Sequence, residues 1–255
     1  AVNRHMRFVK GWDDLLLAEW KKCKNDKAVI TSHPPGYIPP NTLASPGLTV
    51  LRASQPSASG EIRLRGEPLK NAPKAPLPGA FACPGFMFAR GEVIGEVPYD
   101  PFLYFEQEEI CLSARLYTHG WQVFHPTKII AYHLYNTTPV SYTRHSHWGD
   151  HADWSNLNRI ARERRDHLLG YQEASSPEAL ADLDNYGHGD AHSIEEYGEF
   201  CGIDFATRSV GEKALNCGFI PGFSPAVKPA AVKAAPAVPT PVETAPPKLI
   251  SKFLQ

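Results

Sequence analysis

The chain has 255 residues, a formal net charge of −1 and 42% hydrophobic residues. This length allows one large domain or two small ones, and the hydrophobic share is sufficient for a core. The near-neutral charge gives no general electrostatic basis for binding nucleic acid or a membrane surface. No apolar run approaches the roughly 18 residues that a membrane-spanning helix needs, so we expect neither kind of partner.

The termini and the cysteines predict the cellular setting. The chain begins Ala1-Val2-Asn3, with neither an apolar signal region nor an initiator Met, which suits a fragment or a trimmed chain. The five cysteines are odd in number, widely spaced and without a CxxC pair. We therefore expect reduced thiols and a cytoplasmic location. Composition shifts after Phe223 to Pro, Ala, Val and Lys, which predicts a domain over 1–222 and a disordered tail over 223–255.

In the first half of the chain, Trp12, Leu15, Leu16 and Trp20 recur at helical spacing and predict a helix over 7–25. Alternating patterns and proline-rich stretches predict the elements that follow. They are a buried strand at 28–31, a loop at 33–40, two strands at 48–52 and 61–65 joined by a turn at 54–60, an irregular stretch at 70–80 and an aromatic strand at 81–89.

The second half is predicted to contain more helix. Ile110, Ala114 and Tyr117 share one face of a helix over 108–118, which His119-Gly120 would end. Strands follow at 122–124 and 128–132, separated at Pro126. The remaining predicted elements are an arginine-rich helix over 155–169 and shorter helices over 177–183 and 193–200.

The start of the 108–118 helix carries the most informative residues. Glu106, Glu108, Glu109 and Arg115 stand in otherwise apolar surroundings, where charges are costly unless they are paired, metal-bound or catalytic. Glu108 lies at the helix N-terminus, which favours an anion, and Arg115 follows two turns later on the same face. A surface helix with ordinary charge pairs explains the same spacing, so both interpretations stay open.

Three groups of residues offer metal ligands. Asn3-Arg4-His5 has the spacing of a chelating pair at a strand end, although an Asn ligand brings no charge. His133 ends an apolar strand and is either a ligand or a buried structural histidine. His145, His147, Asp150 and His151 could bind zinc in a hydrolase, or belong to a solvated loop, and no Glu stands beside them on a helix to act as base.

The order of these motifs resembles the cytoplasmic GlcNAc transferases that act on protein hydroxyls, relatives of the hydroxyproline GlcNAc transferases and of the polypeptide GalNAc transferases. The resemblance runs from Asn3 to about Phe205. Five blocks carry it: Asn3 to Phe8 with Trp12-Asp13, Pro84 to Phe88, Val97 to Pro101, Gln107 to Glu109 with Arg115 and Gly120, and Tyr186 to Gly189 with Ser193 to Phe205. His133 and Tyr135 are similar to the family's late metal-site histidine and the aromatic residue behind it.

The resemblance implies an α/β fold of the GT-A type, with a Rossmann-like mixed sheet. It implies a UDP-sugar-dependent hexosyltransferase that moves GlcNAc from UDP-GlcNAc to a hydroxyl of a protein or glycan, with retention and with Mn²⁺ or Mg²⁺. The implied metal ligands are Asn3, His5 and His133. The implied catalytic residues are Glu108, Glu109 and Arg115, with Arg115 holding a carboxylate in place, and the implied substrate-binding residues are Trp12, Phe86, Asp100 and Tyr135.

The sequence also departs from the family pattern. Asn3 replaces an Asp, Gln107 replaces a Gly, and the chain begins at the metal motif, where the family has already formed its first nucleotide-binding strands. We therefore expect a partial domain with an exposed sheet edge. A catalytically inactive remnant of the same fold, acting as a binding protein, is the alternative function.

Overall fold

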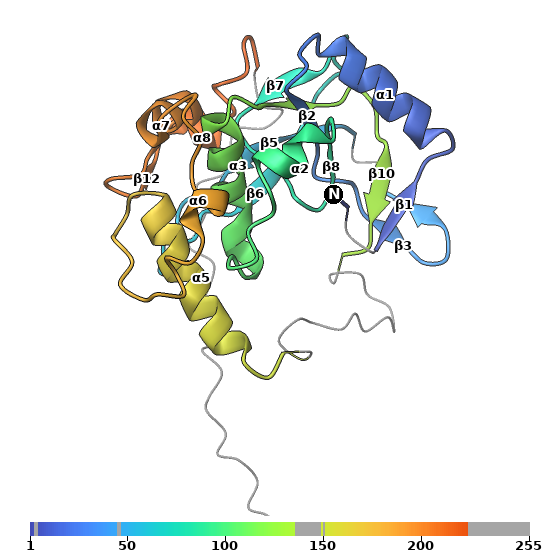
Figure 1. The fold of residues 1–255 in the computed structure, drawn as a ribbon. Helices are drawn as coiled ribbons and strands as arrows, with labels where there is room; N and C mark the ends of the chain where they lie inside the picture. Colours follow the sequence, from blue (N-terminus) through green and yellow to red (C-terminus); the bar gives the residue numbers. More distant parts are fainter. Residues whose placement is uncertain (3–4, 45–46, 136–148, 150, 224–255) are drawn as a thin grey trace, which may run out of the picture.

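The computed structural model describes residues 1–2, 5–44, 47–135, 149 and 151–223. The chain forms a mixed α/β structure whose strands gather in one small sheet and several two-stranded ribbons (Figure 1). The strands are β1 Met6–Phe8, β2 Ala28–Thr31, β3 Tyr37–Ile38, β4 Thr42–Leu43, β5 Thr49–Ala53, β6 Leu64–Pro68, β7 Leu77–Gly79, β8 Met87–Phe88, β9 Gln122–His125, β10 Ala131–His133, β11 Ile203–Asp204 and β12 Ser209–Val210. The helices are α1 Trp12–Lys22, α2 Glu92–Glu96, the 3₁₀ turn η1 Phe105–Gln107, α3 Glu108–Thr118, α5 Trp154–Leu168, α6 Leu183–Tyr186, α7 Ile194–Cys201 and α8 Glu212–Leu215.

The central sheet has four strands in the order β7-β9-β2-β8. β2 and β9 are parallel, and the outer strands β7 and β8 run antiparallel to them. All four residues of β2 are buried, as expected for a strand covered on both faces. The sequence therefore predicted both the bounds of β2 and the mixed α/β class.

Helix α3 has the predicted bounds, Glu108–Thr118. Its first turn carries Glu108 and Glu109, and Gly120 adopts φ +78° two residues after its end, a conformation that glycine reaches without strain. Most of α3 is buried, and Ile110, Cys111 and Ala114 pack in the largest core cluster. The helix is thus a central element rather than a surface one.

The predicted helix over 7–25 was too long at both ends. Gly11, at φ +68°, precedes α1, and Met6–Phe8 form strand β1 instead of a first helical turn. β1 pairs with β10 in antiparallel register, with Met6 opposite His133. A partner so distant in sequence outweighs the local helical pattern.

The predicted hairpin is present as β5 and β6, although β6 begins at Leu64 rather than at residue 61. The loop at 33–40 contains Tyr37–Ile38, which pair with β4, and the stretch at 70–80 contains β7. Only Met87–Phe88 of the aromatic stretch over 81–89 form a strand, because residues 83–86 turn instead. The later strands β9 and β10 were predicted, with β10 restricted to 131–133.

Of the helices in the C-terminal part, α7 has a side-chain cap and α5 follows its prediction closely. Ser193 caps α7 with a reciprocal capping box to Glu196, and α5 lies within one residue of its predicted bounds. The predicted helix at 177–183 was wrong, since residues 177–182 form turns and α6 begins at Leu183. The predicted tail over 223–255 lies outside the described residues from position 224 onward.

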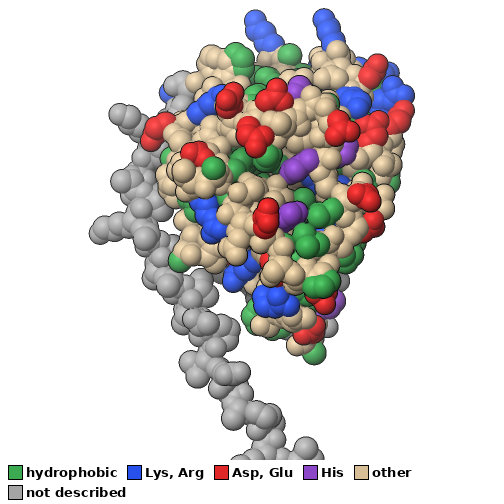
Figure 2. Space-filling model, turned by 60° about the vertical axis from the view of Figure 1, so that its left-hand side comes forward, with side chains coloured by type: hydrophobic (Ala, Val, Ile, Leu, Met, Phe, Trp, Pro, Cys, Tyr) green, Lys and Arg blue, Asp and Glu red, His purple; other side chains and the backbone are tan. Residues whose placement is uncertain are grey.

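All five cysteines are free thiols, as predicted. None of the helices in the described ranges combines the length and the apolar composition needed to traverse a bilayer. On the face that carries α5 and α7, acidic, basic and apolar side chains are interspersed rather than gathered by sign (Figure 2). This pattern agrees with the near-neutral charge of the chain.

Candidate functional site

The acid pair Glu108 and Glu109 lies in the first turn of α3, where the helix dipole favours negative charge. Both side chains are half-buried. The hydroxyl of Tyr99 donates a hydrogen bond to Glu108. Burial nevertheless raises the pKa of Glu108 above its ordinary value, because the charged form loses solvent. A carboxyl group in this state can exchange a proton nearer to neutral pH than a surface glutamate does.

Cys83 faces Glu109 from the turn that follows the 70–80 stretch. Its Sγ donates to Oε1 of Glu109 over 3.9 Å. Thr31, the last residue of β2, fixes this turn because its hydroxyl accepts from the backbone N–H of Cys83 at 2.9 Å and donates to the carbonyl of Phe86 at 2.9 Å. Burial, and then the nearby charge of Glu109, raise the pKa of Cys83 to about 12, so the thiol stays protonated.

His5 and His133 come together through the β1–β10 ribbon. His5 immediately precedes β1, and His133 is the last residue of β10. Their ring centroids lie 6.2 Å apart, edge to face. His133 is buried, its backbone N–H donates to the carbonyl of Pro35, and Leu134 donates to the carbonyl of His5. The ribbon thus brings together two histidines that are 128 positions apart in the sequence.

Tyr135 connects the histidines with the acid pair. Its ring centroid lies 4.5 Å from that of His133, and its hydroxyl donates to the carbonyl of Pro34 at 2.7 Å and lies 3.1 Å from Nδ1 of His33. Burial raises the pKa of Tyr135, and the nearby charge of Glu109 adds to that effect. Tyr135 therefore packs on His133 and lies within electrostatic range of Glu109.

Two of the three predicted metal ligands, His5 and His133, lie in the described ranges. Within the ranges that the structure describes, no group of three or more His, Cys, Asp or Glu side chains is placed to hold a metal ion. His5 and His133 are two adjacent imidazoles, and the third predicted ligand, Asn3, lies outside the described residues. The metal-ligand roles of Asn3, His5 and His133 therefore stay a prediction.

Comparison with known families adds one finding. Residues 1–207, out of 255, match the profile of the family described as Glycosyltransferase (GlcNAc). The chain belongs to this glycosyltransferase family. A search of the curated proteins finds no match to it. The matched range contains every site residue named above, so the acid pair, Tyr135 and the histidines all belong to the glycosyltransferase region.

Arg115 of this glycosyltransferase has different hydrogen-bond partners from those expected. Its guanidinium donates to the backbone carbonyls of Pro98 at 2.8 Å, Gly187 at 3.2 Å and Asn185 at 3.4 Å. It is buried, and burial lowers its pKa while the charge of Asp100 opposes that effect. Arg115 therefore joins α3 to the segment after α6, and these hydrogen bonds involve carbonyl groups rather than the expected carboxylate.

Two of the predicted substrate-binding side chains are buried, and a third is exposed. Asp100 is 3% exposed, accepts from Nε of Arg164 at 2.6 Å and accepts from the backbone N–H of Phe102. Phe86 is 1% exposed and packs in a core cluster beneath α1. Trp12 is exposed at the start of α1 and packs on Phe8, with ring centroids 4.7 Å apart. Tyr135, the fourth, is half-buried and feels the charge of Glu109.

The histidine-rich segment offers little structure to test. His145, His147 and Asp150 lie outside the described residues. His151 is exposed, and its ring lies edge-on to that of Tyr104 at 6.1 Å. The hydrolase interpretation therefore gains no support from the described residues.

Sequence reasoning missed several residues of the glycosyltransferase site. Cys83, Tyr99 and His33 contact the acid pair or Tyr135, yet each is a lone polar residue beside proline or glycine in the sequence. Two weak signals were available, since His33 follows the buried strand β2 and Tyr99 stands in the Val97–Pro101 block of the resemblance. Gln107 was noted as a departure from the family pattern, but its partners were not predicted.

Proposed function

We propose that this glycosyltransferase moves GlcNAc from UDP-GlcNAc to a hydroxyl group of a protein, peptide or glycan acceptor, with retention of the anomeric configuration. The family profile names GlcNAc transfer. The parallel β2–β9 pair, flanked by antiparallel strands, is compatible with the Rossmann-like mixed sheet of a GT-A domain. Reduced thiols agree with the cytoplasmic location that we propose.

The donor side of the proposed site lies at the β1–β10 ribbon. We propose that His5 and His133, with Asn3, hold Mn²⁺ or Mg²⁺. A divalent cation supplies charge neutralisation of the departing diphosphate. The contribution of the chain is to keep the two imidazoles beside each other, since the register of β1 and β10 places His133 opposite Met6.

The acceptor side lies at the start of α3. An oxocarbenium-like sugar centre is stabilised by a nearby carboxylate, and we assign this role to Glu109, with Glu108 exchanging a proton or orienting a sugar hydroxyl. The Cys83 thiol and the Tyr99 hydroxyl orient the two carboxylates. Tyr135 would contact the sugar between the histidines and Glu109.

The other predicted residues would act without touching the sugar. Arg115 holds the far end of α3, and Asp100 holds the segment before η1 through its pair with Arg164. Phe86 supports the turn that presents Cys83. Trp12 is exposed enough to meet a substrate group that extends beyond the ribbon.

One observation carries the proposal. Tyr135 packs against His133 of the histidine pair, with ring centroids 4.5 Å apart, and the charge of Glu109 at the start of α3 acts on its hydroxyl. A sugar diphosphate needs this combination, because its leaving group and its anomeric carbon must be stabilised at the same time.

The test is a calorimetric titration of UDP into the full chain with and without Mn²⁺, followed by transfer of labelled GlcNAc to a hydroxyl-containing peptide. We expect metal-dependent UDP binding that His133→Ala abolishes and that His192→Ala, in an exposed histidine just before α7, leaves intact. Metal-independent UDP binding without transfer would instead support the second candidate, an inactive binding protein. No UDP binding under either condition would contradict both.

A further inference from the structure

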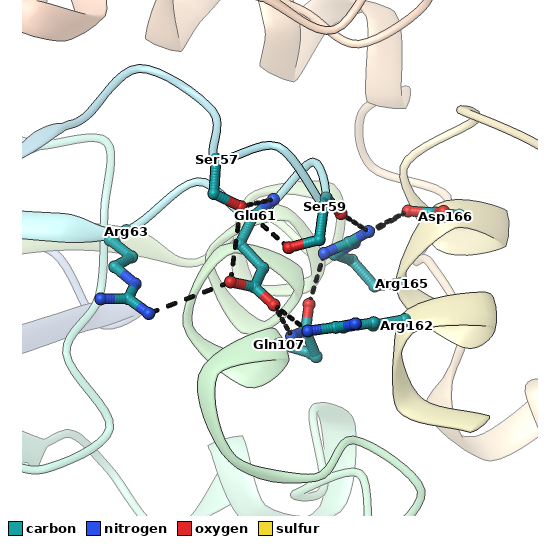
Figure 3. Close-up of polar contacts among 8 residues, drawn as sticks. All are labelled: Ser57, Ser59, Glu61, Arg63, Gln107, Arg162, Arg165 and Asp166. Atoms are coloured by element: carbon teal, nitrogen blue, oxygen red, sulfur yellow. Dashed lines mark hydrogen bonds and ion pairs between the residues drawn. The ribbon is translucent and has the colours of Figure 1, made fainter. Parts of the chain in front are cut away.

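Gln107 lies at the junction between the acid pair and the arginine-rich helix α5 (Figure 3). It is the last residue of η1 and directly precedes Glu108, yet it is only 1% exposed. Its Nε2 donates to Oε1 of Glu61 at 3.1 Å, and its Oε1 accepts from Nη1 of Arg165 at 2.6 Å. Both ends of the amide are therefore bound, which fixes the side-chain orientation.

The two partners of Gln107 are themselves held in place. Glu61 is buried and also accepts from Nη2 of Arg162 at 2.9 Å, with Arg63 at 4.0 Å. Arg165 is buried and donates to the carbonyl of Ser59 and to the carboxylate of Asp166. We call Glu61, Gln107, Arg162 and Arg165 the Gln107 network. It joins the 57–61 turn, η1 and α5 into one hydrogen-bonded unit (Figure 3).

The direction of these contacts matters for the acid pair. Gln107 points toward α5, whereas the next residue, Glu108, points toward Tyr99, and Glu109 points toward Cys83. The backbone at the start of α3 is therefore held from one side by the Gln107 network while it presents its carboxylates on another. Phe105, two residues before Gln107, adopts φ +50°, a conformation that a non-glycine residue keeps only when its surroundings enforce it.

The orientation of the Gln107 amide matches the charges of its two partners, Glu61 and Arg165. The N–H₂ group faces the carboxylate and the carbonyl faces the guanidinium, so reversing the amide would oppose both partners. Because such buried networks are fully directional, they specify one backbone position rather than a range.

We propose that Gln107, Glu61 and Arg165 are positioning residues of the transfer reaction, which set where Glu108 and Glu109 stand relative to the sugar. This inference rests on the proposed function. It assigns a task to α5, an element that contributes none of the predicted site residues. The pKa of Glu108 and the rate of the transfer step then both depend on residues that never touch a substrate.

The experiment uses the full chain and compares Gln107→Leu with the exchanged pair Glu61→Gln/Gln107→Glu. Leucine removes both hydrogen bonds at similar volume. The exchanged pair restores an amide beside a carboxylate, and its carboxylate faces Arg165. We measure kcat and KM for UDP-GlcNAc, the pH profile of kcat, and the titration of the Glu108 carboxyl by NMR.

We expect Gln107→Leu to lower kcat by roughly 10–100-fold with an almost unchanged donor KM, the order of effect produced by misplacing a catalytic group by an ångström or less. The acid limb of the pH profile and the Glu108 titration should shift together. The exchanged pair should recover most of kcat. Recovery by a double change that keeps the network chemistry is not expected of a residue that only adds stability.

Glu67→Gln is the control, because Glu67 is half-buried and pairs with Arg52 at 3.0 Å on the β5–β6 hairpin, away from η1. It should lower the melting temperature without moving the Glu108 titration. Equal losses of kcat in Glu67→Gln and Gln107→Leu would overturn the proposal. If Gln107→Leu does not fold, Arg165→Lys, which keeps the charge but not the bidentate geometry, is measured in its place.

The NMR titration separates this inference from the proposed function. If the wild-type chain transfers no sugar, the proposed function fails, and the Glu108 titration still decides whether the Gln107 network controls the carboxyl group. An unchanged titration in folded Gln107→Leu or Arg165→Lys overturns the inference in either case.

Discussion

Two regions meet at the start of α3 and differ in how their polar groups are satisfied. On the α5 side, buried charges stand opposite charges of the other sign, as in Arg164 with Asp100 and Arg162 with Glu61. On the ribbon side, an acid, a thiol and a phenol gather, and burial raises the pKa of Glu108, Cys83 and Tyr135. The paired charges on the α5 side stabilise the fold. The buried acid, thiol and phenol on the ribbon side cost folding free energy, which is typical of functional sites.

The largest expected effect is a loss of transfer activity on the ribbon side. Glu109→Gln removes the carboxylate charge but keeps the shape of the side chain, so we expect transfer to fall by about 10²–10⁴-fold with little change in melting temperature. A kinetic assay of GlcNAc transfer checks this, with calorimetry on the same sample. Retained transfer would remove Glu109 from the catalytic residues.

In the α5 region, we expect a substitution to lower stability rather than transfer activity. Asp100→Ala leaves Arg164 buried without its carboxylate, and breaking a buried pair in this way costs about 3–5 kcal/mol. Urea denaturation would measure the loss. If Asp100 instead contacts substrate directly, the variant will keep its stability and lose donor binding.

Acid should destabilise the fold through His125, which joins the sheet to the β5–β6 hairpin. Its Nδ1 lies 3.2 Å from the carbonyl of Thr31, its Nε2 accepts from the backbone N–H of Leu51, and burial lowers its pKa to about 4. The unfolded chain takes up this proton near pH 6.5, so stability is complete above that pH and falls as pH drops toward 4.

The pH effect should reach about 3 kcal/mol, from a pKa difference of roughly 2.5 units. Denaturation at a series of pH values measures it, and His125→Gln should flatten the dependence between pH 6.5 and 4. An equally steep dependence in that variant would assign the effect to other groups.

A close packing contact beside His125 gives a related prediction. A Cβ atom at Gly79 would lie 2.5 Å from Nε2 of His125, which is buried and cannot move aside. Gly79→Ala should therefore destabilise the chain by about 1–3 kcal/mol, as overpacking usually does. Gly91→Ala is the control, because a Cβ atom there meets no neighbour within 4 Å.

The smallest effect is expected at the surface. Glu92 and Arg90 form an exposed ion pair at 2.6 Å. Exposed pairs contribute little because water and salt screen them. Glu92→Gln should leave both the melting temperature and transfer unchanged within error, and a clear loss of either would show that this surface has a further task.

The sequence predicted the parts of the fold that depend on local patterns. The bounds of α3 and β2 follow from an acidic first turn, a terminal glycine and a short apolar run. The sequence prediction failed where pairing with a strand that is distant in the sequence determines the local structure. Met6–Phe8 continue a helical pattern, but β10 draws them into a strand.

The site prediction rests on residue types, and the partners of those residues were harder to predict. Tyr135 packs on His133 with ring centroids 4.5 Å apart, and the roles assigned to Glu108, Glu109, His133 and Tyr135 stay predictions. Asp100 gave the same signal as a substrate-binding carboxylate, and only the fold reveals Arg164, which is 64 positions away. The partners of Gln107 are likewise 46 and 58 positions away, so no local pattern could indicate them.

Both ends of α3 are hydrogen-bonded to segments that come later in the chain, which has a consequence for protein synthesis. Its start is held by Arg165, and its end is held by Asn185, Gly187 and Ala191, whose backbone groups bind Arg115 and Thr118. A nascent chain emerging from the ribosome therefore carries α3 long before either clamp exists. The acid pair reaches its final position only after about residue 191 has emerged, so these contacts make the order of translation part of how the site is assembled.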